Sequence, residues 1–276
     1  MKSLLCAIAK NENRYLKEWI SHYIKLGFDR IILFDNNDID GEALNIVPNE
    51  FVDVVDYRGK HIVVKNHLEK FHHGIQEQAY NDCYHNYSEG YDWIAYFDID
   101  EFLVIDNGLS INEFLSQEKF DNADSIILNW KIYGDNGNIH YENKPVMERF
   151  PFPSKYQNMV VKTIVRTKLK NFISLRNHYA DIINGRYVRP NGEKTIIRSS
   201  QPINYEGARL NHYYTKTIEE WIDRKYKQRE VNGNPNLNDI NNRLREFFIY
   251  NEKTEEKLNV IRERINDKLD QSIFKL

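Results

Sequence analysis

The stretch SLLCAIAKNENRYLKEWISHYIKLGFDRIILFD, residues 3–35, decides the fold prediction because an amphipathic segment joins two apolar ones. Residues 3–9 and 29–35 are short apolar runs of the kind that form buried strands. Between them, apolar residues recur at helical spacing over 13–26, and Gly27 is the residue type that commonly ends a helix. Strand, helix and strand in this order predict one unit of a parallel sheet.

The same alternation of strand and helix continues to about residue 130. The sequence predicts strands at 51–57, 92–98 and 124–130 and a helix at 75–88. Ser110 and Glu113 form a capping-box pattern at the start of a short helix. This order predicts an α/β protein with a mostly parallel sheet covered by helices, in which ligands bind beyond the carboxyl ends of the strands.

The chain changes character after residue 130. Gly, Asn and Pro interrupt short β-like pieces up to about 205, and the sequence beyond 216 is strongly helical. Apolar residues form one stripe on a highly charged helix there: Leu258, Ile261, Ile265 and Leu269. We interpret this as a tail helix packed on the protein. A helix that binds a partner or a membrane surface is the alternative, which the mixed charge signs of its polar face disfavour.

Composition narrows the class of protein and its compartment. The 276 residues include 38 basic and 41 acidic side chains, and this balance argues against a general nucleic-acid binder. Cys6 and Cys83 lie in apolar segments, which predicts reduced, packed thiols and favours the cytoplasm. No stretch has the pattern of a transmembrane segment or a cleaved signal. We therefore expect a cytoplasmic protein, either free or peripheral on the inner face of the membrane.

A predicted strand runs directly into acidic residues. In WIAYFDIDEFLVI, residues 93–105, an apolar run is followed by Asp98, Asp100 and Glu101. Their mutual repulsion, which an apolar neighbourhood increases, requires a positive charge nearby. If residues 97–101 are extended, the two aspartates point to the same side and form a site for Mn²⁺ or Mg²⁺. Solvated turn acids are the alternative, which the preceding apolar run disfavours.

Two metal-dependent chemistries use an Asp-x-Asp pattern of this kind. A nucleotide-sugar transferase binds the donor diphosphate through the metal. A haloacid-dehalogenase-like phosphohydrolase uses the first Asp as nucleophile and has Thr or Val two residues after the second. Phe102 occupies that position here, which favours the transferase. A non-catalytic module that binds nucleotide sugars is a third possibility.

Five segments together give a more specific indication than any one motif. They are AKNENRYLKEWISHYIKLGFDRIILFDNND (9–38), QEQAYNDC (76–83), WIAYFDIDEFL (93–103), NWKIYGDNG (129–137) and LNHYYTKTIEEWIDRKYKQR (210–229). In content and order they resemble the family-92-like group of GT-A-type glycosyltransferases, also described as glycosyl transferase family 2_4. The chain departs from this group at Asp135 and Asn136, where small serines are more typical.

The resemblance implies a fold and a division of the chain. The fold is a GT-A, Rossmann-like mixed sheet flanked by helices, with a helical C-terminal extension. Residues 1–215 would form the catalytic domain, with a nucleotide-binding half at 1–105 and an acceptor half at 106–215. Residues 216–276 would be a helical segment packed on it.

The resemblance also implies ligands and the residues that bind them. The expected ligands are a nucleotide-sugar donor, a glycan or glycolipid acceptor, and Mn²⁺ or Mg²⁺ as cofactor, with no nucleic acid. The implied metal ligands are Asp98, Asp100 and His212. The implied donor-binding residues are Ala9, Lys10, Asn11, Glu12, Asp35, Asp98 and Lys216. Arg224 and Lys225 are further candidates for the phosphates. Turn chemistry, for Asn and Asp, and a solvated helix face, for the cations, are the alternatives.

An inverting transferase also needs a general base for the acceptor hydroxyl. Asp181 has the sequence position that inverting relatives often use, Asp135 is its competitor, and Glu148 is third. From the resemblance and the acid pair together, we expect a hexosyltransferase that uses a UDP-sugar and acts in surface or capsular polysaccharide synthesis. Retention of configuration is left open by the residues alone.

Overall fold

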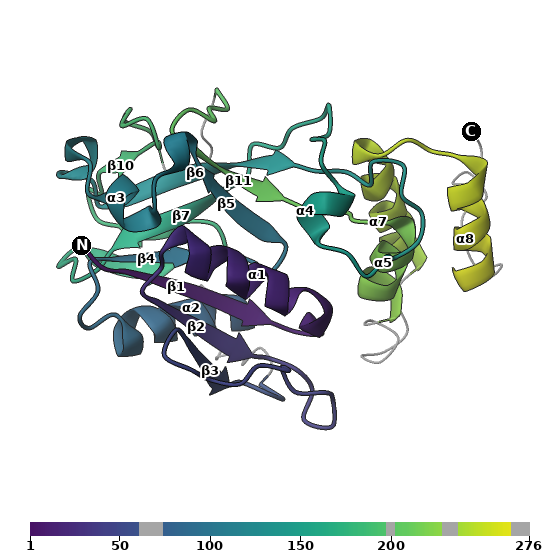
Figure 1. Ribbon diagram of the computed structural model, residues 1–276, viewed down its shortest axis with the longest axis horizontal. Helices are drawn as coiled ribbons and strands as arrows, with labels where there is room; N and C mark the ends of the chain where they lie inside the picture. Colours follow the sequence, from purple (N-terminus) through teal and green to yellow (C-terminus); the bar gives the residue numbers. More distant parts are fainter. Residues whose placement is uncertain (61–73, 197–201, 228–236, 266–276) are drawn as a thin grey trace. The chain divides into compact units, whose positions relative to one another are not determined.

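The computed structural model describes residues 1–60, 74–196, 202–227 and 237–265 (Figure 1). The chain forms two compact units. The first consists of residues 1–130 and 159–211, and the second of residues 131–158 and 212–276. The second unit therefore contains more than the expected C-terminal helices, since residues 131–158 belong to it as well.

The first unit contains most of a mixed sheet, which has nine strands in the described residues. Eight of them follow the order β3-β2-β1-β4-β7-β6-β11-β5, and β10 pairs with β6. Their bounds are β1 Ser3–Ala9, β2 Arg30–Asp35, β3 Val52–Asp56, β4 Trp93–Tyr96, β5 Glu101–Ile105, β6 Ser125–Ile132, β7 Val161–Arg166, β10 Tyr187–Val188 and β11 Ala208–His212. The predicted strands are therefore confirmed, with small differences at their ends.

The sheet has a parallel and an antiparallel part. Strands β3, β2, β1 and β4 run parallel, as the alternation of strands and helices predicts. Strand β7 is antiparallel to both of its neighbours, β4 and β6. The expected α/β class with a mixed sheet flanked by helices is therefore confirmed, and the GT-A assignment stays a prediction.

Two helices cover opposite faces of the parallel strands (Figure 1). Helix α1 (Asn13–Leu26) ends at Gly27, whose φ of 94° is a left-handed conformation that favours glycine. Helix α2 (Ile75–Tyr87) packs its buried residues against alternate residues of β1, namely Leu4 and Cys6. Cys6 and Cys83 are both free and buried, so the prediction of reduced, packed thiols is confirmed.

Short elements complete the first unit. They are η1 (Asp106–Gly108), α3 (Ile111–Leu115), η2 (Glu118–Phe120) and a two-stranded sheet of β8 (Phe172–Leu175) and β9 (Ala180–Ile182). The capping box predicted for Ser110 and Glu113 is present at the start of α3.

The second unit is mainly helical in its described residues. Its helices are α4 (Val146–Arg149), α5 (Ile218–Ile222), the π-helical turn η3 (Asp223–Lys227), α7 (Leu237–Tyr250) and α8 (Glu255–Ile265). The apolar stripe of α8 lies in the core of this unit, because Leu258, Ile261 and Ile265 are all buried there. This confirms the interpretation as a packed helix for those three positions, while Leu269 lies outside the described residues. None of the helices in the described part of the chain has both the length and the apolar character of a membrane crossing.

Candidate active site at the carboxyl edge of the parallel strands

The predicted donor-binding residues of the first unit follow the carboxyl ends of adjacent parallel strands. Strands β1, β2 and β4 end at Ala9, Asp35 and Tyr96. The order β3-β2-β1-β4 reverses its direction of growth at β1, because β2 and β4 lie on its two sides. In open α/β sheets such a reversal leaves a crevice at the carboxyl edge, where ligands bind. The loop at residues 10–12 and Asp98 both begin at this edge.

The acidic residues after β4 form a tight turn. The backbone N–H of Glu101 donates to the carbonyl of Asp98 (3.1 Å), and the N–H of Asp98 donates to Oε2 of Glu101 (2.8 Å). The assumption that residues 97–101 are extended is therefore wrong, because Ile99 and Asp100 occupy the turn. Glu101 is fully buried and closes the turn from inside, whereas the side chain of Asp98 is 32% exposed. Asp100 is 7% exposed.

Helix α1 holds this turn from one face of the sheet. The indole N–H of Trp19 donates to the carbonyls of Asp98 (2.9 Å) and Glu101 (3.1 Å). The hydroxyl of Tyr23 donates to the Glu101 carbonyl (2.9 Å) and accepts from the N–H of Leu103 (3.0 Å). These bonds satisfy backbone groups of the turn and of the start of β5, the strand that follows it. The apolar face of α1 thus also fixes the backbone that carries the acids.

A buried lysine supplies the positive charge that the acids require. The ammonium of Lys162, on β7, lies 2.8 Å from Oδ1 of Asp98 and 3.7 Å from Oε2 of Glu101. Its side chain is 1% exposed. Gln76 Nε2 (2.6 Å) and the hydroxyl of Tyr80 (3.0 Å) also donate to Oδ1 of Asp98. Three donors therefore converge on one carboxylate oxygen, and Oδ2 takes part in none of these bonds.

The pKa values of this cluster follow from burial and charge. Burial is the largest single influence on Lys162 and lowers its pKa, but Asp98 and Glu101 outweigh it and hold the pKa above its ordinary value. Burial raises the pKa of Glu101 well above its usual range, although Lys162 opposes this. Asp98 is the closer partner of the ammonium. We infer that Lys162 is charged and paired with Asp98.

Sequence reasoning missed Lys162, Gln76 and Tyr80. The signal for the lysine was present, because VVKTIVRT (160–167) places a charged residue in the middle of an apolar strand pattern. A charged residue at such a position is almost always paired when buried. Gln76 and Tyr80 lie in the matched segment QEQAYNDC, and their spacing of four places them on one face of α2.

The loops after β1 and β2 are joined to each other. The N–H of Asn11, whose φ is 58°, donates to Oδ1 of Asn37 (2.7 Å), and Lys10 forms an ion pair with Asp38 (2.8 Å). Asp35 accepts from the backbone and side chain of Asn37 and, through its second oxygen, from the N–H of Leu44 (3.0 Å). The carboxylate of Asp35 therefore organises the loop that follows it, and its role in donor binding stays a prediction.

Asp135, one candidate for the general base, lies in the second unit. Its Oδ2 is 2.5 Å from the ammonium of Lys257, on α8, and both side chains are almost fully buried. Its Oδ1 accepts from the N–H of Gly137 (2.9 Å). Burial raises the pKa of Asp135, and Lys257 and the Gly137 amide only partly offset this. This ion pair ties the Gly134–Gly137 loop to α8.

The remaining predicted site residues have different surroundings. Asp181, on β9, accepts from Nε of Arg176 (2.9 Å), and its side chain is 23% exposed. His212 is the last residue of β11 and Lys216 directly precedes the N-cap of α5; both belong to the second unit and are buried. Lys216 has a φ of 54°, which is uncommon for a residue with a side chain. Glu148 is exposed on α4.

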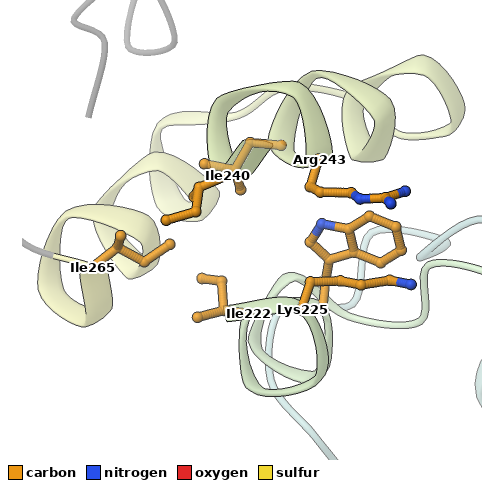
Figure 2. A pocket seen from close by; sticks show the side chains of 7 residues that line it. Ile222, Lys225, Ile240, Arg243 and Ile265 are labelled. Carbon is orange, nitrogen blue, oxygen red and sulfur yellow. The ribbon is translucent and has the colours of Figure 1, made fainter. Parts of the chain in front are cut away.

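The two further cations proposed for the donor phosphates contact aromatic or backbone groups. Arg224 donates to the carbonyl of Tyr214 (3.0 Å). Lys225 lies 5.3 Å from the centre of the Trp221 ring and lines a small cavity with Ile222, Ile240, Arg243 and Ile265 (Figure 2). The cavity volume of about 10 Å³ is near that of a single water site, so it does not accommodate a sugar.

The acid pair has the chemistry of a hard-cation site. Mg²⁺ and Mn²⁺ prefer carboxylate oxygens, and Mg²⁺ is usually held by one or two carboxylates together with waters and substrate phosphates. Among the described residues no three His, Cys, Asp or Glu side chains gather as a metal cage. The carboxylates of Asp98, whose Oδ2 lies outside these three contacts, and of Asp100 are the type of ligand that such a cation takes, and metal binding by them stays a prediction.

Comparison with known proteins identifies the family. The model of glycosyltransferase family 92 matches residues 5–248. The match covers most of the chain, so the chain belongs to glycosyltransferase family 92. This confirms the resemblance seen in the five segments.

Plant proteins of the same family are similar to the chain. A glycosyltransferase family 92 protein of Ricinus communis is 22% identical over 233 residues, which is 81% of this chain and 37% of that protein. A family 92 protein of Oryza sativa subsp. japonica is 27% identical over 113 residues, covering 40% of this chain and 18% of its own length. One from Arabidopsis thaliana is 28% identical over 102 residues, covering 36% and 16%. The chain thus spans little more than a third of the Ricinus protein.

Proposed function

We propose that this chain is a metal-dependent glycosyltransferase of GT-A type that moves a hexose from a UDP-sugar to a glycan or glycolipid acceptor. The observation that supports it most is the acid turn at residues 98–101, which follows β4 at the reversal of strand order in a family 92 chain. The parallel strands β3-β2-β1-β4 followed by the antiparallel β7 favour the GT-A assignment.

In this proposal the donor binds along the carboxyl edge of the first unit. The loop from Ala9 to Glu12 contacts the nucleoside, and Asp35 supports it by holding the neighbouring loop. Asp98 presents Oδ2 to the donor because its other oxygen is held by the protein. Lys216 is the proposed cationic contact for the phosphates.

Asp98 and Asp100, with His212 as the proposed third ligand, would hold Mn²⁺ or Mg²⁺. When bound, the ion would neutralise the negative charge that develops on the departing nucleoside diphosphate. The carboxylates provide the oxygen ligands, and the bonds from Trp19 and Tyr23 keep the turn in place without help from substrate. Such pre-organisation reduces the reorganisation needed during the reaction.

Asp181 is the general base in this proposal. Its carboxylate is partly exposed and can approach an acceptor hydroxyl, whereas the carboxylate of Asp135 is 4% exposed and paired with Lys257. A general base must reach the proton that it removes. Access therefore favours Asp181 over Asp135. The acceptor in this proposal is a glycan or glycolipid, and the enzyme acts in surface or capsular polysaccharide synthesis.

The test is metal-dependent turnover of UDP-sugars by the wild-type chain and by Asp100→Ala. We expect wild-type hydrolysis or transfer that requires Mn²⁺, and a loss of at least about a hundredfold in the variant. Asp121→Ala, which removes an exposed acid of the same unit, is the matched control and should retain full activity.

Three outcomes would contradict the proposed function. Equal, metal-independent turnover by wild type and Asp100→Ala would remove the metal from the mechanism. Phosphatase activity that depends on Asp98 and needs no sugar nucleotide would favour the phosphohydrolase. Calorimetric binding of UDP-sugars without any product would favour the binding module.

A further inference from the structure

We propose that Lys162 is an internal counter-ion that sets how Asp98 binds its ligands: it fixes the carboxylate and keeps the affinity for free metal low until a diphosphate is present. This rests on the proposed function, since it concerns the same acid turn. Lys162 acts through Asp98 and is a positioning residue.

The lysine site is built into the core. The ammonium comes from β7, between β4 and β6, and its side chain is 1% exposed. Burial of an unpaired ammonium is strongly unfavourable, so a buried lysine persists only with close partners. Asp98 and Glu101 are those partners, at 2.8 and 3.7 Å.

The ion pair is closed to solvent on the lysine side only. Lys162 is 1% exposed, whereas the carboxylate of Asp98 is 32% exposed at the strand end. Lys162, Gln76 and Tyr80 all donate to Oδ1. This set of bonds fixes the orientation of the carboxylate and leaves Oδ2 for a ligand, which is the arrangement expected of a pre-organised site.

The charge of Lys162 also affects the binding of a metal ion at Asp98. A dication that binds Asp98 approaches an ammonium that cannot move into solvent, and the two repel each other in a region of low dielectric. The negative charges of a nucleoside diphosphate offset this repulsion. Metal and diphosphate should therefore bind with strong positive coupling, and each should raise the affinity for the other by the same factor.

The experiment compares two variants that differ only at Lys162. Glu101→Gln keeps the turn bond to the Asp98 N–H and is the reference, while Glu101→Gln with Lys162→Met also removes the ammonium. Binding of Mn²⁺ is measured by electron paramagnetic resonance, without UDP and with saturating UDP. We expect the double variant to bind free Mn²⁺ at least about tenfold more tightly than the reference, and its coupling to UDP to fall by a similar factor.

Lys170→Met is the control for net charge. It removes an exposed cation from the same unit and should change Mn²⁺ affinity less than about twofold. Unchanged or weaker binding of free Mn²⁺ by the folded double variant would overturn the proposal and leave Lys162 a purely structural role.

A measurement on the wild-type chain tests the proposal even if the double variant does not fold. Wild type should bind Mn²⁺ at least about tenfold more tightly with UDP than without it. Equal affinity in both conditions, together with Mn²⁺-dependent transfer, would overturn the role of Lys162 but not the glycosyltransferase. Absence of Mn²⁺ binding even with UDP would overturn both.

Discussion

Two buried ion pairs, one in each unit, have the same chemistry but different exposure. In the second unit, Arg149 and Glu220 form two parallel bonds of 2.8 and 3.0 Å, and their side chains are 3% and 2% exposed. In the first unit, Lys162 is equally buried but its partner Asp98 is 32% exposed. Both side chains of the Arg149–Glu220 pair are closed to solvent, and we call it the sealed pair. In the Lys162–Asp98 pair only the lysine is closed to solvent, and we call it the open pair.

The difference indicates what each pair can do. A sealed pair with a bidentate geometry fixes the packing of the elements that carry it, here α4 and α5, and offers no atom to a ligand. A pair that is open on the carboxylate side keeps one oxygen for a ligand while the cation holds the other. Exposure of the carboxylate beside a buried cation therefore distinguishes the Lys162–Asp98 pair from the Arg149–Glu220 pair.

The largest expected effect concerns the sealed pair. Arg149→Met leaves Glu220 buried without its charge partner and should lower the free energy of unfolding by about 3–5 kcal/mol. Adding Glu220→Gln should recover a large part of this loss, because Gln keeps the bonds of the Thr217 capping box. Denaturant unfolding followed by circular dichroism measures both variants.

Lys144→Met is the matched control for that experiment. Its partner Glu142 lies 2.7 Å away, but both side chains are more than half exposed, so the loss of stability should be far smaller than for Arg149→Met. Equal losses for Arg149→Met and Lys144→Met would show that burial does not separate the two kinds of pair.

A smaller effect is expected for Asp135→Asn, which tests whether this second sealed pair is structural or catalytic. The change leaves Lys257 without its charged partner and should cost about 1–3 kcal/mol in stability. At a temperature where the variant is folded, kcat should fall less than about threefold, since a lost general base costs about a hundredfold or more. A hundredfold loss of kcat with unchanged unfolding would instead make Asp135 the base.

The smallest effect is expected for Trp19→Phe, which loosens the open pair. It removes the N–H that donates to Asp98 and Glu101 and should cost about 1–2 kcal/mol. The KM for the donor should rise because the turn is less well held. Trp93→Phe, also fully buried, is the control. It should lower stability but leave this KM unchanged, and a similar rise in both variants would contradict the role of Trp19.

Local patterns in the sequence predicted the elements of the fold well. The helix at 13–26 has the observed bounds, Gly27 ends it, and the capping box of Ser110 and Glu113 is formed. These features depend on residues within a few positions of one another, so a single chain segment contains their cause. The extended conformation assumed for residues 97–101 failed because Trp19 and Tyr23 hold a turn from a distant helix.

The sequence by itself determined that the chain is an α/β protein of family 92 with acids after its fourth strand, since periodicity and matched segments are properties of the chain order. Only the tertiary structure decided which charge relieves those acids. Lys162 is 64 positions from Asp98, and only the antiparallel pairing of β7 with β4 brings them together. The same holds for Asp135, whose charge is compensated by Lys257 on α8, a residue far from it in the sequence. Electrostatic partners depend on distance in space, which the sheet and the helix packing set.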